Sequence, residues 1–456
     1  MIRAALAMTL IGVSLAVVVA ASWGGIFSQT AARVLFIALC LIGLRSSTLR
    51  EGLLLAGAMV LSVLLLRHPD GQAAWGAAVD LAAFFAAFIA LLTALKIAAE
   101  RSRSVLAVGR YLIGQPAGRR FIATASGGHV LGVFLNFGAV SLMAPLIQSA
   151  TKHPDGSTDT RLERRQLSAL LRGFAWILLW APTTLSQAVL LTLFTEIDQG
   201  KIVLCGIATA LVMMGVGFAY DRFEWRGTRP PPATHAALPL PAKAMLRVGC
   251  ICALLIAGTV ALQINAGFST ALSLMFMAPG VTLVWFACQK PVGTAITSQL
   301  ATFWPALRSD APGLARSAMA LGLSGFIGRA LAEVLPVAAM TQNLDLADVP
   351  GWLFLAVLPV LITLGGQVAL SPIILVVFIG HVIQTLPALP AEPTHIVFAL
   401  SAGWAISMFT SPNATATLLI SATSKIPPTT LTWRWNLRYG IISYAVLVGI
   451  FAWLEA

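Results

Sequence analysis

Long apolar stretches recur from one end of the chain to the other. Stretches of roughly 18 to 20 apolar residues are long enough for a helix to cross about 30 Å of hydrocarbon. The runs at 53–66 and 248–262 are continuous and do not alternate with polar residues at every second position, so they predict helices rather than the strands of a barrel. We therefore predict an all-α polytopic membrane protein with about eleven transmembrane helices. The predicted spans are 4–22, 31–44, 52–66, 74–96, 170–194, 202–219, 248–263, 269–287, 317–340, 396–422 and 439–454.

Two further apolar segments, 121–149 and 352–387, are interrupted near their middle. The first break holds an Asn and a Gly at 136–138, and the second runs from a Gly pair to a Ser-Pro pair at 365–372. Breaks at mid-membrane are tolerated where the backbone is buried in protein or lines a cavity. We predict that both segments are re-entrant helical hairpins, which enter and leave the membrane on the same side.

Charged residues make up only 10% of the chain, and the net charge is +12. A soluble domain is about a quarter charged, so the solvent of this chain's surface must be lipid. Basic residues gather in cytoplasmic loops, which explains the positive charge better than a nucleic-acid partner does. A cytoplasmic N-terminus places most of them on one side. The basic segments 96–120 and 152–165 share that side only if 121–149 is a hairpin. We expect a multi-pass protein of a bacterial inner membrane.

The order of spans divides the chain into two halves. Residues 227–247 are rich in Pro and Ala at their start and predict a cytoplasmic linker. The halves, 31–226 and 248–456, each contain three spans, a hairpin and two more spans, in opposite orientations. Such an inverted-topology repeat is characteristic of secondary transporters. Residues 1–30 hold an extra transmembrane helix, which we favour over a cleaved signal peptide because the apolar stretch is long.

Polar residues interrupt the apolar pattern at both hairpin tips and again in the spans that follow them, at 181–187 and 410–417. A Pro breaks the helical hydrogen bonds in each of these spans, and hydroxyl or amide groups are costly in hydrocarbon unless they face a polar site. The alternative is a set of Pro kinks whose polar neighbours hold helices together. Four breaks at corresponding places favour a solute site near the midplane. The residues predicted to line it are Asn136, Phe137, Gly138, Thr183, Thr184, Ser186, Gln187, Gln367, Ser371, Thr410, Ser411, Pro412, Asn413 and Thr415.

Few ionisable residues fall inside the predicted membrane segments. Asp80 is a candidate proton or cation site. Arg329 and Glu333 are four residues apart on one helix face and are expected to pair, either as a structural lock or as part of a coupling path. His129 and His381 lie within the two hairpins, where a His either titrates near neutral pH or is a satisfied interior residue.

The order of these segments resembles the ion transporter superfamily, and most closely the divalent anion–sodium symporters and arsenite-permease-like proteins. Residues 134–147 look like the first hairpin of that family. Residues 321–335, with three Gly, look like its Gly-rich span, and 402–421 look like its broken span with a Thr-Pro-Pro-Asn-Ala pattern. The layout matches over nearly the whole chain.

The resemblance implies a dimerising scaffold domain and a transport domain that crosses the membrane like an elevator. It also implies that solute is held between the two tips and the two broken spans, with a sodium ion near Asn136, Gly138, Thr410 and Asn413. The first tip has Asn-Phe-Gly where the family has Ser-Asn-Thr, so coupling to sodium and coupling to protons both stay open.

These patterns predict a secondary active transporter of a small anionic solute, a carboxylate or an oxyanion. A cation–proton antiporter on the same fold is the alternative. An integral membrane glycan-processing enzyme is less favoured, because no predicted external loop exceeds roughly ten residues. The chain has no Gly-rich ATP-binding loop with a Lys, so an ion gradient is the expected energy source. The expected partners are the solute, the bilayer and a second copy, with no cofactor other than sodium.

Overall fold

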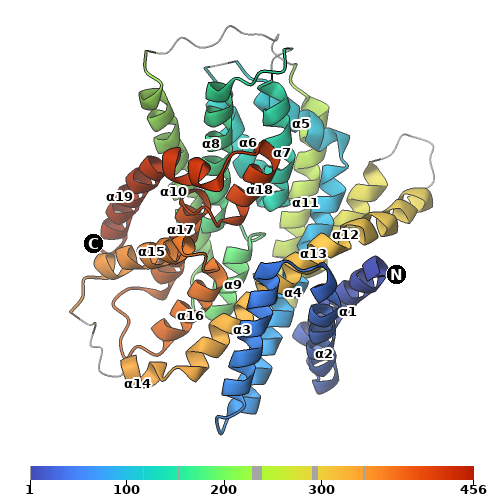
Figure 1. Ribbon diagram of the computed structural model, residues 1–456, viewed down its shortest axis with the longest axis vertical. Helices are drawn as coiled ribbons and strands as arrows, with labels where there is room; N and C mark the ends of the chain where they lie inside the picture. The colour runs from blue at the N-terminus through green and yellow to red at the C-terminus, as the bar shows by residue number, and fades with distance from the viewer. Residues whose placement is uncertain are drawn as a thin grey trace.

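The computed structural model describes residues 2–116, 118–152, 155–227, 239–289, 296–341, 346 and 348–456. Within these residues the chain is helical, with a single isolated β-bridge between Lys152 and Thr158 and no strand. This confirms the predicted all-α class. The helices in Figure 1 are α1 (Ile2–Trp23), α2 (Ile26–Gly43), α3 (Leu49–Leu65), α4 (Gly71–Glu100), α5 (Arg103–Ile113), α6 (Arg120–Leu135), α7 (Phe137–Ala150), α8 (Thr160–Ala175), α9 (Leu185–Leu193), α10 (Gln199–Glu224), α11 (Ala242–Ala266), α12 (Thr270–Cys288), α13 (Ile296–Val334), α14 (Val337–Thr341), α15 (Gly351–Gln367), α16 (Pro372–Gln384), α17 (Pro393–Thr410), α18 (Thr415–Ser424) and α19 (Leu437–Leu454). Short segments η1 (Leu44–Ser46), η2 (Trp176–Leu179) and η3 (Thr430–Arg434, a π-helical turn) lie between some of them.

Eight segments of the described chain are long and apolar enough to cross a membrane. They are α1, α2 with η1, α4, α10, α11, α12, the pair α17 and α18, and α19. The four arms of the predicted hairpins, α6, α7, α15 and α16, are apolar but only 13 to 17 residues long. At about 1.5 Å per residue such arms reach roughly 20–25 Å, less than the hydrocarbon thickness of about 30 Å.

The helix boundaries differ from the sequence-based prediction where charged segments were taken for loops. Helix α5 lies inside the basic segment 96–120, and α8 begins ten residues before the predicted span 170–194. Helix α5 is amphipathic: Val105 and Val108 are buried, while Arg103 and Arg110 are exposed. The number of charged residues in a segment does not reveal an amphipathic helix, because the charges of such a helix gather on one face.

The second half departs from the predicted boundaries at two further places. Helix α13 extends over 39 residues and ends at Val334, two residues before Pro336, so the predicted span 317–340 stops early. Most of the predicted linker 227–247 lies outside the described residues. Its last part is not linker, because α11 begins at Ala242.

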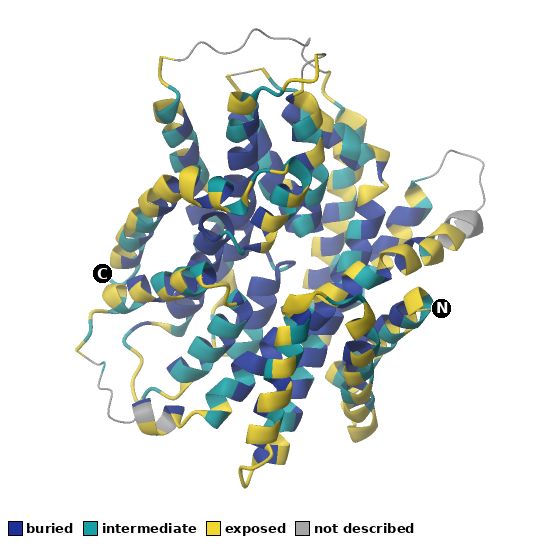
Figure 2. Ribbon diagram, viewed as in Figure 1, coloured by how far each residue is buried: buried dark blue, intermediate teal, exposed yellow. Residues whose placement is uncertain are grey.

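The helices pack as two bundles. Helices α1 to α4 and α11 to α13 form the scaffold bundle, in which α13 lies along α3 and α4 and α12 lies between α4 and α11. Helices α6 to α10 and α15 to α19 form the hairpin bundle, which contains both hairpins and both broken spans. The closest packing between the bundles is that of α13 against α16. Figure 2 shows the buried residues in the middle of the molecule, whereas α1 to α3 and α19 carry much of the exposed apolar surface.

Three glycines let α13 approach its neighbours closely. A Cβ atom at Gly322 would lie 2.7 Å from the carbonyl oxygen of Ala82 in α4, and one at Gly325 would lie 2.5 Å from the ring of Phe85. A Cβ atom at Gly328 would lie 3.0 Å from the carbonyl oxygen of Ile374 in α16. Small residues at helix interfaces permit backbones to approach in membranes. Helix α13 therefore contacts both bundles through its glycines.

We expect the substitution Gly322→Ala to destabilise the protein, because the new methyl group overlaps a backbone carbonyl that cannot move aside. Overpacking of this kind costs about 1–3 kcal/mol. Gly313→Ala is the control in the same helix, since Gly313 is exposed and nothing lies within 4 Å of its Cβ position. Thermal unfolding of the purified protein in detergent should show a lower Tm for Gly322→Ala and an unchanged or slightly higher Tm for Gly313→Ala. Equal Tm values would show that α13 and α4 are not packed this closely.

Candidate functional site

The first hairpin turns at a single residue. Helix α6 ends at Leu135 and α7 begins at Phe137, so Asn136 alone joins them, with a φ of 49°. Positive φ is uncommon outside Gly, and Asn is among the residues that tolerate it best. The side-chain Nδ2 of Asn136 donates to the carbonyl oxygen of Thr183 at 3.3 Å. Its Oδ1 is buried and accepts no hydrogen bond from any described residue, so this tip presents an unused acceptor.

The first broken span changes from α8 to the 3-10 turn η2 and then loses helical structure at 180–184 before α9 begins. Side chains from the break bind the carbonyl groups that lose their helical partners. Ser186 donates to the Leu178 carbonyl at 2.9 Å. Gln187 Nε2 lies 2.9 and 3.0 Å from the carbonyl oxygens of Leu178 and Leu179. These polar side chains therefore provide hydrogen bonds to buried backbone carbonyls, which need a partner.

Two threonines of this break also bond to backbone groups. The hydroxyl of Thr183 donates to the carbonyl of Val133 in α6, which joins the break to the first hairpin. The hydroxyl of Thr184 donates to Ala181 O at 2.7 Å and accepts from the amide of Gln187 at 3.4 Å, as the N-cap of α9. Both threonines are buried, and their hydroxyl groups are engaged in this conformation.

The second hairpin turns in the second half of the predicted break. Helix α15 continues through Gly365, Gly366 and Gln367, and the turn occupies 368–371 with a φ of 64° at Ala369. The turn therefore lies within the predicted break at 365–372, in its second half. The glycines permit close packing instead of turning the chain: a Cβ atom at Gly365 would lie 2.2 Å from the side chain of Leu375.

The second broken span loses helical structure at 411–414, between α17 and α18. Ser411 Oγ donates to the Gly366 carbonyl at 2.7 Å, and Asn413 Nδ2 lies 3.2 and 3.3 Å from the carbonyl oxygens of Gly366 and Gln367. In return, Gln367 Nε2 lies 3.4 Å from the carbonyl oxygen of Thr410. Each hairpin tip is thus bonded to the broken span that follows it.

Contacts between the halves join the four breaks into one unit. Gln187 Nε2 donates to Ser401 Oγ of α17 at 3.1 Å, and the rings of Trp176 and Phe409 lie 5.7 Å apart. The packing repeats between the halves: α6 lies on α8 as α15 lies on α17, and α9 lies on α16 as α18 lies on α7. In Figure 1 the pair α6 and α7 lies in the upper part of the view, and α15 and α16 lie lower.

The remaining predicted site residues are in mixed surroundings. The ring of Phe137 packs on Phe174 at 5.4 Å, which places it in the core of the first half. Ser371 is buried and precedes α16. Pro412 is half-buried within the second break, and Thr415 is exposed at the start of α18.

Five ionisable residues were predicted as candidates for ion or proton coupling, and the side chains of two of them are fixed by hydrogen bonds. Asp80 accepts two hydrogen bonds of 2.7 Å from Arg33, so this pair joins α4 to α2 within the scaffold bundle, away from the breaks. His129 Nδ1 lies 3.0 Å from the Gly173 carbonyl oxygen, and its Nε2 accepts from Trp180 Nε1 at 3.3 Å.

The other three candidates come together at the interface between the bundles. Arg329 and Glu333 of α13 form an ion pair of 3.0 Å. Arg329 Nη1 also lies 2.8 Å from Nε2 of His381 in α16. The structure therefore brings a residue of the second hairpin into contact with Arg329, which is in turn paired with Glu333.

Sequence reasoning missed a buried cation in the first broken span. Arg172 of α8 donates to Asn436 Oδ1 at 2.8 Å and to the Trp435 carbonyl at 3.1 Å. Its guanidinium lies 4.8 and 5.1 Å from the ring centroids of Tyr439 and Tyr220. Among the described residues no carboxylate forms an ion pair with it. An Arg within the predicted span 170–194 was the available signal, and its role is to join α8, α10 and α19.

A second cation lies beside the first hairpin tip. The stem of Lys96 in α4 is so close to Gly138 that a Cβ atom there would lie 2.7 Å from Lys96 Cγ. Its Nζ is 3.5 Å from Glu100, and its side chain is about one third exposed. In the sequence analysis Lys96 counted as a cytoplasmic charge, because it is the last residue of the predicted span 74–96.

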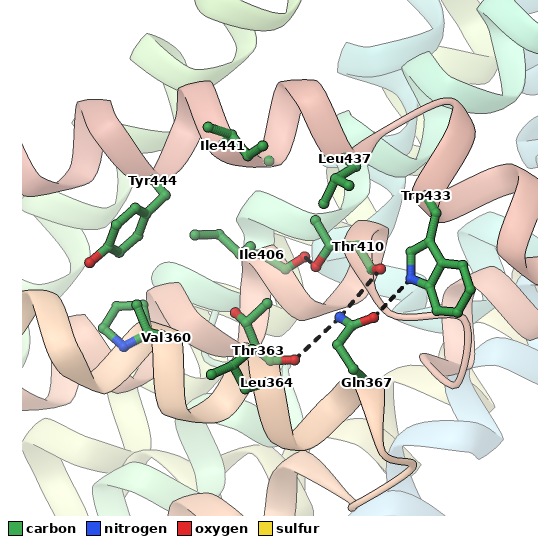
Figure 3. A pocket seen from close by; sticks show the side chains of 12 residues that line it. Val360, Thr363, Leu364, Gln367, Ile406, Thr410, Trp433, Leu437, Ile441 and Tyr444 are labelled. Carbon is green, nitrogen blue, oxygen red and sulfur yellow. Dashed lines mark hydrogen bonds between the residues drawn. The ribbon is translucent and has the colours of Figure 1, made fainter.

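A cavity of about 510 Å³ adjoins the second tip. Figure 3 shows Gln367 at one end, where its Nε2 bonds to the Thr363 and Thr410 carbonyls and its Oε1 accepts from Trp433 at 2.9 Å. The rest of the lining is almost wholly apolar. The cavity is lined by Pro359, Val360, Thr363, Leu364, Gln367, Ile406, Thr410, Trp433, Leu437, Gly440, Ile441 and Tyr444.

Two solved transporter structures are similar to this chain. The YdaH transporter of Alcanivorax borkumensis, described as having an unusual topology, is 17% identical, with a TM-score of 0.53 over 93% of this chain and 99% of that one. MtrF of Neisseria gonorrhoeae, described as illuminating a class of antimetabolite efflux pumps, is 13% identical, with a TM-score of 0.54 over 90% and 96%. No family model matches, and no curated protein matches. The chain has the fold of these membrane transporters.

We expect Gln187→Leu to lower the Tm of the purified protein, because it leaves the Leu179 carbonyl of the first break without its side-chain donor and the Leu178 carbonyl with Ser186 alone. An unsatisfied buried polar group costs about 1–3 kcal/mol. Ser401→Ala is the matched control, since it removes only the third partner of Gln187 and leaves both carbonyls bonded. Thermal unfolding should rank wild type and Ser401→Ala close together and Gln187→Leu well below them. The opposite ranking would mean that Gln187 does not hold the break.

Proposed function

We propose that this protein is a secondary active transporter that carries a small organic anion across a bacterial inner membrane. The helix N-termini at the breaks support this proposal most directly. Helices α7, α9, α16 and α18 each begin at a break. In α7, α16 and α18 no side chain caps the first amides, although Asn136 and Ser371 occupy two of the N-cap positions. Uncapped amides and the helix dipole attract negative charge.

The charges around the breaks agree with an anionic solute. The described residues 134–138, 180–187, 366–372 and 410–417 include no acidic side chain. A cation, Lys96, lies beside the first tip, which its stem touches. A carboxylate would find amide donors at the breaks and, beside the first tip, the ammonium group of Lys96, which is paired with Glu100.

The apolar cavity favours an organic solute over an inorganic oxyanion. Its volume of about 510 Å³ lies within the range of roughly 300–1,000 Å³ that is usual for small-molecule sites. Gln367 and Thr410 belong both to this cavity and to the breaks. A solute with a carboxylate at the breaks and an apolar body in the cavity would fit both features, and an organic solute also agrees with MtrF, which is described among antimetabolite efflux pumps.

An elevator motion is the mechanism that best suits the division into bundles. All four breaks belong to the hairpin bundle, whereas the scaffold bundle has none of them. The hairpin bundle is joined internally by hydrogen bonds between tips and breaks and by the Arg172 contacts. A body held together in this way can move as a unit past α13. The resemblance to divalent anion–sodium symporters agrees with this motion and with a dimer formed through the scaffold.

The two other predicted roles, a sodium site at the tips and a cation–proton antiporter that uses Asp80, are not equally well supported by the contacts of these residues. A sodium site near the tips would use side-chain oxygens: Asn136 Oδ1 accepts no hydrogen bond from a described residue, and the bonds of Thr410 and Asn413 to carbonyls are donated, which leaves their oxygen lone pairs free to bind a cation. A cation–proton antiporter with Asp80 as carrier has less support, since two hydrogen bonds from Arg33 hold that carboxylate in the scaffold. We therefore keep anion transport as the proposed function.

The inverted repeat predicts which hairpin opens to which side. In a cysteine-free background, Gly118→Cys and Ser157→Cys place exposed labels at the open end of the first hairpin. Asp348→Cys and Ala388→Cys do so for the second hairpin. A membrane-impermeant maleimide should label the first two only from the cytoplasmic face and the last two only from the other face. If Gly118→Cys and Ser157→Cys react from opposite faces, residues 121–149 cross the membrane and the proposed site is lost.

The solute proposal is tested by a stabilisation screen of purified protein with organic carboxylates of increasing apolar size, with and without sodium. A bound solute raises the Tm by mass action. Asn136→Gly keeps the positive φ of the tip and removes the amide group. We expect it to weaken the apparent affinity of any carboxylate found by about tenfold or more, since it removes the second N–H of Asn136 Nδ2, which Thr183 does not use, and bonds with charged groups contribute about 1.5–3 kcal/mol. Asn265→Ala, at the exposed end of α11, is the control and should keep the full shift. A full shift in Asn136→Gly would exclude the first tip from the site.

A further inference from the structure

The interface between the bundles contains a polar contact that the solute site does not use. His381 of α16 and Arg329 of α13 meet there, with 2.8 Å between His381 Nε2 and Arg329 Nη1. The other ring nitrogen, Nδ1, lies 2.7 Å from the carbonyl oxygen of Val377 in the same helix. One residue therefore belongs to the hairpin bundle and the other to the scaffold bundle.

The partners of His381 determine its protonation state in this contact. A carbonyl oxygen only accepts a hydrogen bond, so Nδ1 must carry a proton and donate it to Val377 O. A guanidinium group only donates, so Nε2 must hold a free lone pair and accept from Arg329. The imidazole is therefore neutral, with its single ring proton on Nδ1.

A second proton on His381 is incompatible with this geometry. It would occupy Nε2 and place one N–H group against another, with two positive charges about 3 Å apart. Arg329 cannot relieve the repulsion by losing its own proton, because a guanidinium stays charged in proteins. Protonation of His381 must therefore break the hydrogen bond between α16 and α13.

Few other charges surround His381. Helix α13 supplies Arg329 and Glu333, which pair with each other at 3.0 Å. Helices α9, α14 and α15, which pack against α16, carry no titratable side chain within their bounds, and neither does the rest of α16. Helix α17 carries His395 near its start, where Nδ1 lies 2.6 Å from Glu455. A change in the charge of His381 therefore changes mainly its electrostatic interactions with Arg329 and Glu333.

The Arg329 side chain is only partly satisfied by its neighbours. Its Nε is buried and has no hydrogen-bond partner among the described residues. Its terminal nitrogens bond to Glu333 and to His381. Loss of the His381 bond thus leaves Arg329 held by Glu333 alone, which lies in the same helix and does not join the bundles.

We propose that His381 is a proton-binding site that controls movement of the hairpin bundle. The neutral ring fastens α16 to α13 through Arg329, and proton uptake at Nε2 releases it. The bound proton then travels with α16, because Arg329 and Glu333 stay with the scaffold. This inference rests on the proposed transport function and names the proton as the coupling ion.

The test measures the distance between the bundles as a function of pH, with no solute required. Spin labels at Gln72→Cys in α4 and Ala388→Cys after α16 place exposed probes on the two bundles, in the full chain reconstituted in lipid nanodiscs. Between about pH 8 and about pH 4.5, a second distance population should grow by about tenfold relative to the first. His381→Gln should abolish this change, because a Gln amide can accept from Arg329 and donate to Val377 without titrating.

Two further variants make the result specific. His129→Gln replaces the His of the other hairpin and should keep the wild-type response to pH. Arg329→Gln removes the partner in the scaffold, so the second population should be present at both pH values. A pH response that persists in His381→Gln, or a wild type that shows none, would overturn the proton site. Neither outcome bears on the proposed function, which fails instead if no carboxylate stabilises the protein in the screen.

Discussion

The structure depends on one constraint: a helix that breaks inside the membrane frees backbone groups that only the protein can pair. Each break meets this constraint with its own side chains and with those of the adjoining hairpin. Ser186 and Gln187 bind carbonyls of the first break, and Asn413 binds the carbonyls at the end of α15. An unpaired carbonyl in hydrocarbon costs several kcal/mol, so these bonds come before any contact with a solute.

This constraint changes which atoms are left to recognise a solute. Most hydroxyls and amides that mark the breaks in the sequence are engaged with backbone carbonyls in the structure. The uncapped amides of α7, α16 and α18, the second N–H of Asn136 Nδ2 and the Oδ1 of the same residue remain available. Recognition would therefore depend on the backbone and on helix dipoles more than on polar side chains, which accounts for a solute site with so few charged residues.

The sequence predicted the class of fold and the places where the helices break, because both follow from local patterns. Apolar length set the spans, and Asn136 marked the first tip within one residue. The second turn lies within the predicted stretch 365–372, but Gly365 and Gly366 remain in α15 because they serve the packing of α16 and α17, a tertiary role that local pattern does not reveal. Arg172 was overlooked, and the pairing of Arg33 with Asp80 was not foreseen, because such contacts join helices far apart in the sequence.

The separation of the polar contacts into two kinds has a consequence for coupling. Most bonds at the breaks run to carbonyl oxygens from side chains that do not titrate, so they hold the hairpin bundle together as the pH changes. The contact between Arg329 and His381 joins two side chains on opposite bundles, and one of them can take up a proton. A transporter built in this way would keep its solute site rigid and place its ion dependence at the sliding surface. Changes at the breaks would then alter the solute it accepts without altering the ion that drives it.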